Sequence, residues 1–190
     1  DAASGNRIAE YPVPTGAEGK SSSVYTNADR YWGYIAVSDG ILFGSIVNHE
    51  HITKWSYLES DMNRLYSESD ALFAMDALTG KLTWIYRAEH SIRHNTIAIG
   101  GGKVFFIDRP LAEFDQLRNP YRKGVQAEGK LVALDAGTGK TVYTLDTDIY
   151  GTLLALSLEH DILLMTYQYT SFRLPSETGG RMTAFRASDG

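Results

Sequence analysis

The sequence contains no cysteine, which excludes disulfide cross-links, thiolate metal sites and thiol nucleophiles. Basic side chains are also scarce, because 18 Lys and Arg stand against 23 Asp and Glu and leave a net charge of −5. This balance creates no field that would gather phosphate backbones, so we expect no nucleic-acid partner. No apolar run approaches the ~20 residues that cross a bilayer, so we expect no membrane span.

Proline and methionine are few as well, with five and four copies. Twelve tyrosines and an aromatic content of 12% favour strands over helices. A hydrophobic content of 43% is that of a folded domain. The composition therefore indicates an all-β fold.

A short repeat organises the chain. Asp76–Lys81 (DALTGK) returns as Asp135–Lys140 (DAGTGK), and partial copies stand at Asp1–Asn6 and Arg186–Gly190. The copies begin at positions 1, 76, 135 and 186, and they delimit three intervals. Each copy has the chemistry of a tight hairpin, since an Asp or Ser bonds nearby amides and a Gly accepts positive φ.

Short apolar segments flank these turns and a second set of turns inside each interval. Around the repeat we expect strands at Leu72–Met75 and Leu82–Tyr86, Leu131–Leu134 and Thr141–Leu145, and Met182–Phe185. Inside the intervals we expect Ile35–Val37 and Ile41–Phe43, Ile97–Ile99 and Val104–Phe106, and Leu154–Leu156 and Ile162–Leu164. Four short strands per repeat predict a partial β-propeller of about three four-stranded antiparallel blades. A solenoid or a β-sandwich is the structural alternative.

The string from Ala74 to Trp84 closely resembles the repeat of the pyrroloquinoline quinone (PQQ) propeller family. The resemblance implies an often eight-bladed propeller, of which these residues are a segment, with Trp and Gly of adjacent blades packed into a docking belt. It assigns docking roles to Trp84, Gly80 and Gly139, with Tyr143 as a conservative replacement for Trp. Ala9 stands at the corresponding position of the first copy and predicts a weak point there.

Antiparallel connectivity sorts the loops between two faces. The tight turns all fall on one face, and the long segments 48–70, 109–129 and 168–180 fall on the other. Long loops that converge on one end of a rigid scaffold are where binding sites are usually built. We therefore expect a protein partner or a small-molecule ligand on the long-loop face.

Aligning the innermost strands places residues 31–33, 93–95 and 150–152 at equivalent positions near the channel mouth. The ligand-binding candidates there are Trp32, Arg93, His94, Asn95 and Tyr150. Trp32 offers a stacking surface, Arg93 a partner for carboxylates, and Asn95 a donor or a hard-cation ligand. The alternative is that these are ordinary residues of a polar channel.

Histidines supply no convincing metal site. His49 and His51 form a His-x-His pair that lacks a third ligand at a recognised spacing. The sequence contains no nucleophile elbow, Walker loop or dinucleotide fingerprint either. We assign no catalytic residue and no metal ligand.

Three functions remain open. The first is a non-catalytic binding or scaffolding platform, and the second is a segment of a PQQ- and calcium-dependent quinoprotein oxidoreductase. The third is a hydrolase or lyase, which needs a close His and acid pair. We favour the platform and expect these residues to bind no cofactor. PQQ with calcium is an option for a longer parent protein of which these residues are a segment. Open blade edges predict self-association, and the resemblance implies a periplasmic or extracellular location.

Overall fold

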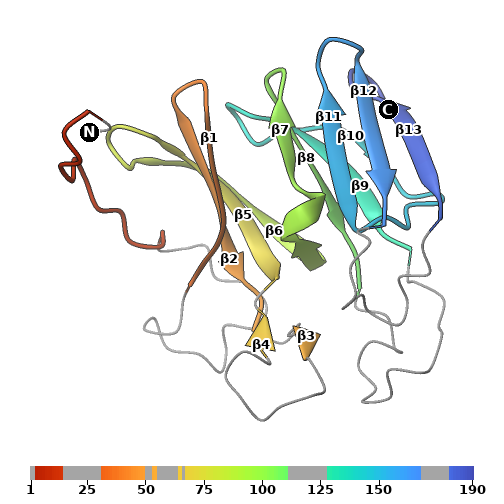
Figure 1. Cartoon of the computed structure of the whole chain (residues 1–190), viewed down its shortest axis with the longest axis horizontal. Coiled ribbons are helices and arrows are strands. Elements are labelled where there is room, and N and C mark those ends of the chain that lie inside the picture. Colours follow the sequence, from red (N-terminus) through yellow and green to blue (C-terminus); the bar gives the residue numbers. More distant parts are fainter. Residues whose placement is uncertain are drawn as a thin grey trace.

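The computed structural model describes residues 3–14, 31–49, 53–54, 64–65, 67–110, 128–167 and 180–190. Within these ranges every regular element is a β-strand, apart from the short 3-10 helix η4 (His94–Thr96). The strands form three antiparallel blades that stand side by side (Figure 1). The prediction of an all-β partial propeller is confirmed. None of the helices in the described residues is long and apolar enough to cross a membrane.

Each blade is built from strands in chain order. Blade I contains β1 (Trp32–Ser38), β2 (Ile41–Val47), β5 (Glu68–Asp76) and β6 (Leu82–Arg93). Blade II contains β7 (Ala98–Gly100), β8 (Lys103–Asp108), β9 (Lys130–Asp135) and β10 (Thr141–Leu145). Blade III contains β11 (Leu153–Ser157), β12 (Ile162–Thr166) and β13 (Met182–Arg186), and β3 (Thr53–Lys54) pairs separately with β4 (Arg64–Leu65). The predicted segments fall within these strands, except that Ile97 lies one residue before β7.

Blades I and II are joined by the unusually long strand β6. The C-terminal part of β6 pairs with β8 of blade II, where Ile92 lies opposite Asp108. The pairing register between β6 and β5 shifts just before this point. The buried Asp108 carboxylate accepts hydrogen bonds from the backbone N–H of Glu89 at 2.6 Å and of His90 at 2.9 Å. Asp108 thus satisfies donors that the shift removes from the ladder.

Apolar side chains fill the spaces between blades. One cluster lies between blades I and II and includes Phe43, Trp84 and Phe106. A second lies between blades II and III and includes Phe105 and Leu163. Both faces of the middle sheet are therefore buried, as the uninterrupted apolar sequence of β8 predicts.

The contact that joins blades I and II is an aromatic ring against a glycine. Trp84, at the end of blade I, lies so close to Gly139 in the turn of blade II that a methyl group there would sit 2.6 Å from Trp84 Cγ. The indole N–H donates to the carbonyl oxygen of Ala136 at 2.9 Å. Gly139 has a φ of +68°, so its backbone conformation also favours glycine.

The same contact recurs twice along the chain. Tyr143 of blade II lies against Gly190, and its hydroxyl donates to the carbonyl oxygen of Ala187 at 3.3 Å. Burial, helped by Asp161 and Asp189, raises the pKa of Tyr143 to about 12, so the hydroxyl keeps the proton that it donates.

The third copy corrects the expectation for the first repeat. Tyr11 lies against Gly80, and its hydroxyl donates to the carbonyl oxygens of Ala77 at 3.1 Å and Leu78 at 2.8 Å. The predicted weak point at Ala9 is therefore wrong. The aromatic residue stands two positions later in the chain, where an alignment without gaps does not find it.

Replacing Gly139 by Ala tests this contact against a matched control. Gly102 has nearly the same φ, +70°, but has nothing within 4 Å of an added methyl group. Gly102→Ala should lower the free energy of unfolding by about 1–2 kcal/mol, which is the cost of a side chain on a left-handed backbone. Gly139→Ala should cost about 1–3 kcal/mol more, because the indole must move. Equal costs in denaturant melts would contradict the docking role.

Candidate functional site on the long-loop face

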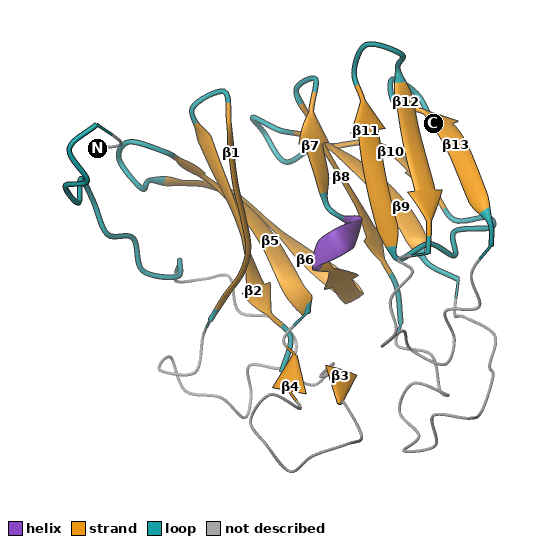
Figure 2. Ribbon diagram, in the orientation of Figure 1, coloured by secondary structure: helices purple, strands orange, loops and turns teal. Residues whose placement is uncertain are grey.

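The two ends of the blades differ in construction. The hairpin turns after β1, β7 and β11 lie together at one end (Figure 2). The connections from β2 to β5, β8 to β9 and β12 to β13 leave from the opposite end, which we call the long-loop face. Strand pairing makes Ala36, Ala98 and Ala155 equivalent, and in blade I the register shifts between Trp32 and Ile35.

Buried polar side chains concentrate at the long-loop face. All those that the described part of the chain contains lie in this half of the blades, and none lies at the tight turns. They are Ser45, Asn48, Glu68, Ser69, Asp70, Ser91, Arg93, Thr96, Asp108, Arg109 and Thr152. A buried polar group is usually hydrogen-bonded, and several members of this layer bond to one another or to the backbone.

Arg93 is held in a buried ion pair. Its Nε and Nη2 both donate to Glu68 Oε1 at 3.2 Å, and the two side chains are 8% and 3% exposed. Thr96 Oγ1 donates to the carbonyl oxygen of Arg93 at 2.7 Å. The candidate Arg93 therefore ties the start of β5 to the end of β6.

His94 takes part in a chain of hydroxyl contacts. Its Nε2 lies 2.8 Å from Ser69 Oγ, which donates to Ser45 Oγ at 2.7 Å. Ser45 Oγ also accepts the backbone N–H of Tyr34 at 2.7 Å. Burial lowers the pKa of His94, and the nearby Glu68 carboxylate opposes that shift.

Gly33 makes room for this chain. A methyl group on Gly33 would lie 2.6 Å from His94 Nε2 and 2.8 Å from the hydroxyl oxygens of Ser45 and Ser69. The absence of a side chain on Gly33 thus allows β1, the innermost strand of blade I, to approach the His94 imidazole.

Tyr150 is the centre of a separate cluster in blade III. Its hydroxyl lies 2.9 Å from Thr183 Oγ1, and the Arg181 guanidinium stacks 4.1 Å from its ring centroid. Arg181 Nη2 also donates to the Asp148 carboxylate at 2.5 Å. Tyr167 packs on the other side with ring centroids 5.1 Å apart. Tyr150 itself is buried.

The remaining two candidates lie in different surroundings. Trp32 packs edge-on against Phe73 at a centroid distance of 5.2 Å, on the outer face of blade I near Tyr11. Asn95 is exposed on η4, which contacts β11. The five candidates are therefore distributed over the blades: His94 and Asn95 adjoin, whereas Trp32 and Tyr150 belong to separate clusters.

Several residues of the polar layer were not found from the sequence. Glu68, Ser69 and Ser45 sit inside strands, where we looked only for apolar alternation. A signal was present, because the polar run Glu68–Asp70 opens an otherwise apolar strand.

The described residues do not form a cation site of their own. No group of three or more His, Asp or Glu side chains within the described ranges could hold a metal ion. Arg93 is paired with the buried Glu68 carboxylate. We therefore derive no chemical step through calcium or PQQ.

Comparisons with known proteins found no matching family model and no matching curated protein. Among solved structures, the chain is similar to quinohemoprotein alcohol dehydrogenase ADHIIG from Pseudomonas putida HK5 (19% identity, 70% of this chain, 20% of that chain, TM-score 0.44). It is also similar to a europium-containing methanol dehydrogenase (14% identity, 83% of this chain, 30% of that chain, TM-score 0.45). A third similar structure is BamB from Moraxella catarrhalis (22% identity, 82% of this chain, 58% of that chain, TM-score 0.23). The chain thus spans less than two thirds of each of these proteins.

The strand order and the repeated aromatic–glycine contact decide the fold. It is a partial β-propeller of antiparallel blades. In this propeller the repeat turns bring blades together, and the opposite ends of the same blades carry the polar layer.

The Glu68–Arg93 pair gives a stability prediction for the propeller. Glu68→Gln should lower the free energy of unfolding by about 3–5 kcal/mol, because one partner of a buried ion pair is removed. Glu89→Gln is the matched control, since Glu89 pairs with Lys130 at 2.9 Å but both side chains are about half exposed. That variant should lose less than about 1 kcal/mol in the same denaturant melts. Similar losses in both would contradict the structural role of the buried pair.

The lowered pKa of His94 predicts a pH dependence. The unfolded chain takes up the proton near the ordinary value of 6.5, and the folded chain takes it up only at lower pH. The propeller should therefore lose stability as pH falls from 7.5 through 6.5 and below. His94→Gln should flatten this slope, whereas His90→Gln, which removes an exposed ring, should leave it in place. An unchanged slope in the His94 variant, measured by denaturant melts, would refute the prediction.

Proposed function

We propose that this propeller is a non-catalytic binding platform whose long-loop face receives a protein or a small molecule. The observation that carries the proposal is the position of the polar layer. The buried polar side chains gather at the strand ends from which the long connections leave, and several of them bond one another or the backbone there. A rigid base below long loops is the usual construction of a binding surface.

The bonding within this layer supports a structural and not a catalytic use. Glu68 holds Arg93, Asp108 accepts two backbone N–H groups, and Ser69 lies between Ser45 and His94. Ser69 has no exposed surface, so its hydroxyl is out of reach of a substrate although it touches an imidazole. His94 contacts Ser69 and the Glu68 carboxylate holds Arg93, so these two side chains are not arranged as the His and acid pair that a hydrolase needs. On the resemblance alone, we propose that such a platform works in the periplasm or outside the cell.

Site-specific photo-cross-linking tests the platform. A benzoylphenylalanine at position 95, replacing the exposed Asn95 of the long-loop face, should give one discrete adduct when the whole protein is expressed in its native host. The same group at Leu78, which is 85% exposed in a tight turn of the opposite end, should give none. Adducts of equal yield at both positions, or none at position 95, would contradict the proposal.

The quinoprotein alternative is tested by calorimetry. Titration of the chain with PQQ in the presence of calcium should give no saturable heat if the propeller is a platform. Saturable heat that requires calcium would support a dehydrogenase segment and direct attention to Trp32, Arg93 and Asn95. Circular dichroism of the titrated sample shows that the protein is folded.

We also propose that copies of this chain associate through strand edges. β13 carries no outer neighbour in the described structure, whereas β5 and β9 are covered by β6 and β10. Residues 5–14 belong to none of the described strands, although Tyr11 docks on Gly80 as Trp84 does on Gly139. We infer that this segment can pair as a strand with the β13 edge of a second copy.

A double proline variant tests the association. Ile8→Pro with Glu10→Pro removes two backbone donors from a segment that pairs with no described strand, so the fold should survive. The unaltered chain should sediment as a dimer or larger species at high concentration, and the variant as a monomer. Ile8→Ala with Glu10→Ala controls for the lost side chains. An unaltered chain that stays monomeric, or a variant that associates equally, would contradict the edge pairing.

A further inference from the structure

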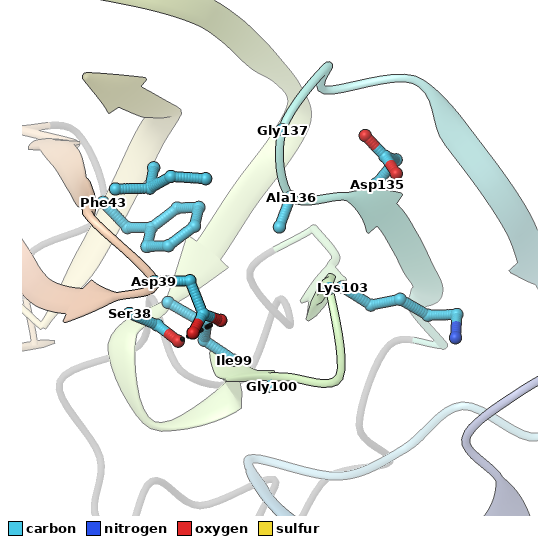
Figure 3. A pocket seen from close by; sticks show the side chains of 11 residues that line it. Ser38, Asp39, Phe43, Ile99, Gly100, Lys103, Asp135, Ala136 and Gly137 are labelled. Atoms are coloured by element: carbon cyan, nitrogen blue, oxygen red, sulfur yellow. Dashed lines mark hydrogen bonds between the residues drawn. The ribbon is translucent and has the colours of Figure 1, made fainter. Parts of the chain in front are cut away.

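A small hollow lies between blades I and II at the tight-turn end, opposite the proposed platform (Figure 3). Its volume is about 180 Å³. The hairpin turns of both blades and the repeat turn of blade II line it. The lining residues are Ser38, Asp39, Ile41, Phe43, Ile99, Gly100, Gly102, Lys103, Asp135, Ala136 and Gly137.

The hollow exists because the hairpin turn of blade II has no side chain. That turn is Gly101-Gly102, whereas the longer turn of blade III begins with Leu158. Leu158 packs on the turn before it, so that a methyl group on Gly101 would lie 2.9 Å from Leu158 Cδ2. The space between blades II and III is therefore filled, and the corresponding space between blades I and II is open.

The size and floor of the hollow suit a compact apolar group. Ile41 and Ile99 are half-buried and form its accessible floor, above the buried Phe43. An apolar protein cavity of about 150 Å³ is sufficient for benzene. A single ring or a short branched alkyl group is thus the right size.

The rim supplies negative charge. Asp39 is exposed at the mouth with a φ of +51°, and Ser38 Oγ donates to its carboxylate at 3.1 Å. Figure 3 shows Asp39 beside Ile99, whereas the Lys103 ammonium extends away from them. Asp135 also lines the hollow, but its carboxylate accepts hydrogen bonds from Thr138 within the repeat turn, and these bonds lower its pKa. A cation is the complementary partner for this rim.

We propose that this hollow binds a small organic ammonium ion, with its apolar body on Ile41 and Ile99 and its charge beside Asp39. The site depends on the glycine turn of blade II. It does not depend on the platform function of the opposite face.

Three probes that share one ring but differ in charge test the site. Benzylammonium, benzyl alcohol and benzoate are titrated into the ¹⁵N-labelled chain, and amide and indole signals are followed. The Trp84 indole is a built-in reporter, because it donates to the lining residue Ala136. Benzylammonium should shift the signals of Trp84, Gly102 and Ala136 in a saturable way. It should bind at least five-fold more tightly than benzyl alcohol, and benzoate should bind least.

Two variants and a matched control complete the experiment. Asp39→Asn tolerates the positive φ and should remove the preference for benzylammonium over benzyl alcohol. Asp161→Asn alters a turn aspartate of similar φ, +52°, in blade III, and should keep that preference. Ser38→Phe should fill the hollow and abolish the shifts with all three probes. No saturable shift in the folded chain, equal affinity for all probes, or an unchanged preference in Asp39→Asn would overturn the proposal.

Discussion

The packing of an aromatic ring on a backbone glycine of the next repeat is the contact on which this structure depends. Trp84 on Gly139, Tyr143 on Gly190 and Tyr11 on Gly80 are three copies of it. Each ring also donates a hydrogen bond to a carbonyl of the same turn, at Ala136, Ala187 and Ala77. Because ring and turn are both parts of the repeat, every blade carries the means to hold its neighbour.

This contact lies near the tight-turn end, and it leaves the opposite end to a different kind of packing. There the spaces between strands hold Glu68 with Arg93 and the hydroxyls of Ser45 and Ser69 with His94. Bonded polar groups specify position more strictly than apolar packing, since each must find its partner. The strand ends at this face are therefore both polar and held in place by specific bonds.

The sequence was sufficient to predict the strands, the blade order and the docking of Trp84, because these depend on a local motif and on alternation. It was not sufficient for Tyr11, since the first copy has two more residues between the turn glycine and the aromatic residue than the later copies have. It also could not identify Glu68 as the partner of Arg93, because their pairing follows from the extended register of β5 and β6. Aligning the innermost strands placed the binding candidates at equivalent positions. It could not show that Arg93 is buried or that the Arg181 guanidinium stacks on the Tyr150 ring.

Trp84 offers the most direct test of the blade-docking interpretation. It is 8% exposed and contributes both packing and an N–H donor. Trp84→Ala should lower the free energy of unfolding by about 3–5 kcal/mol in denaturant melts, and Trp84→Phe, which keeps a ring on Gly139, should lose less. A loss below about 1 kcal/mol for Trp84→Ala would show that the blades are held together by something other than this contact.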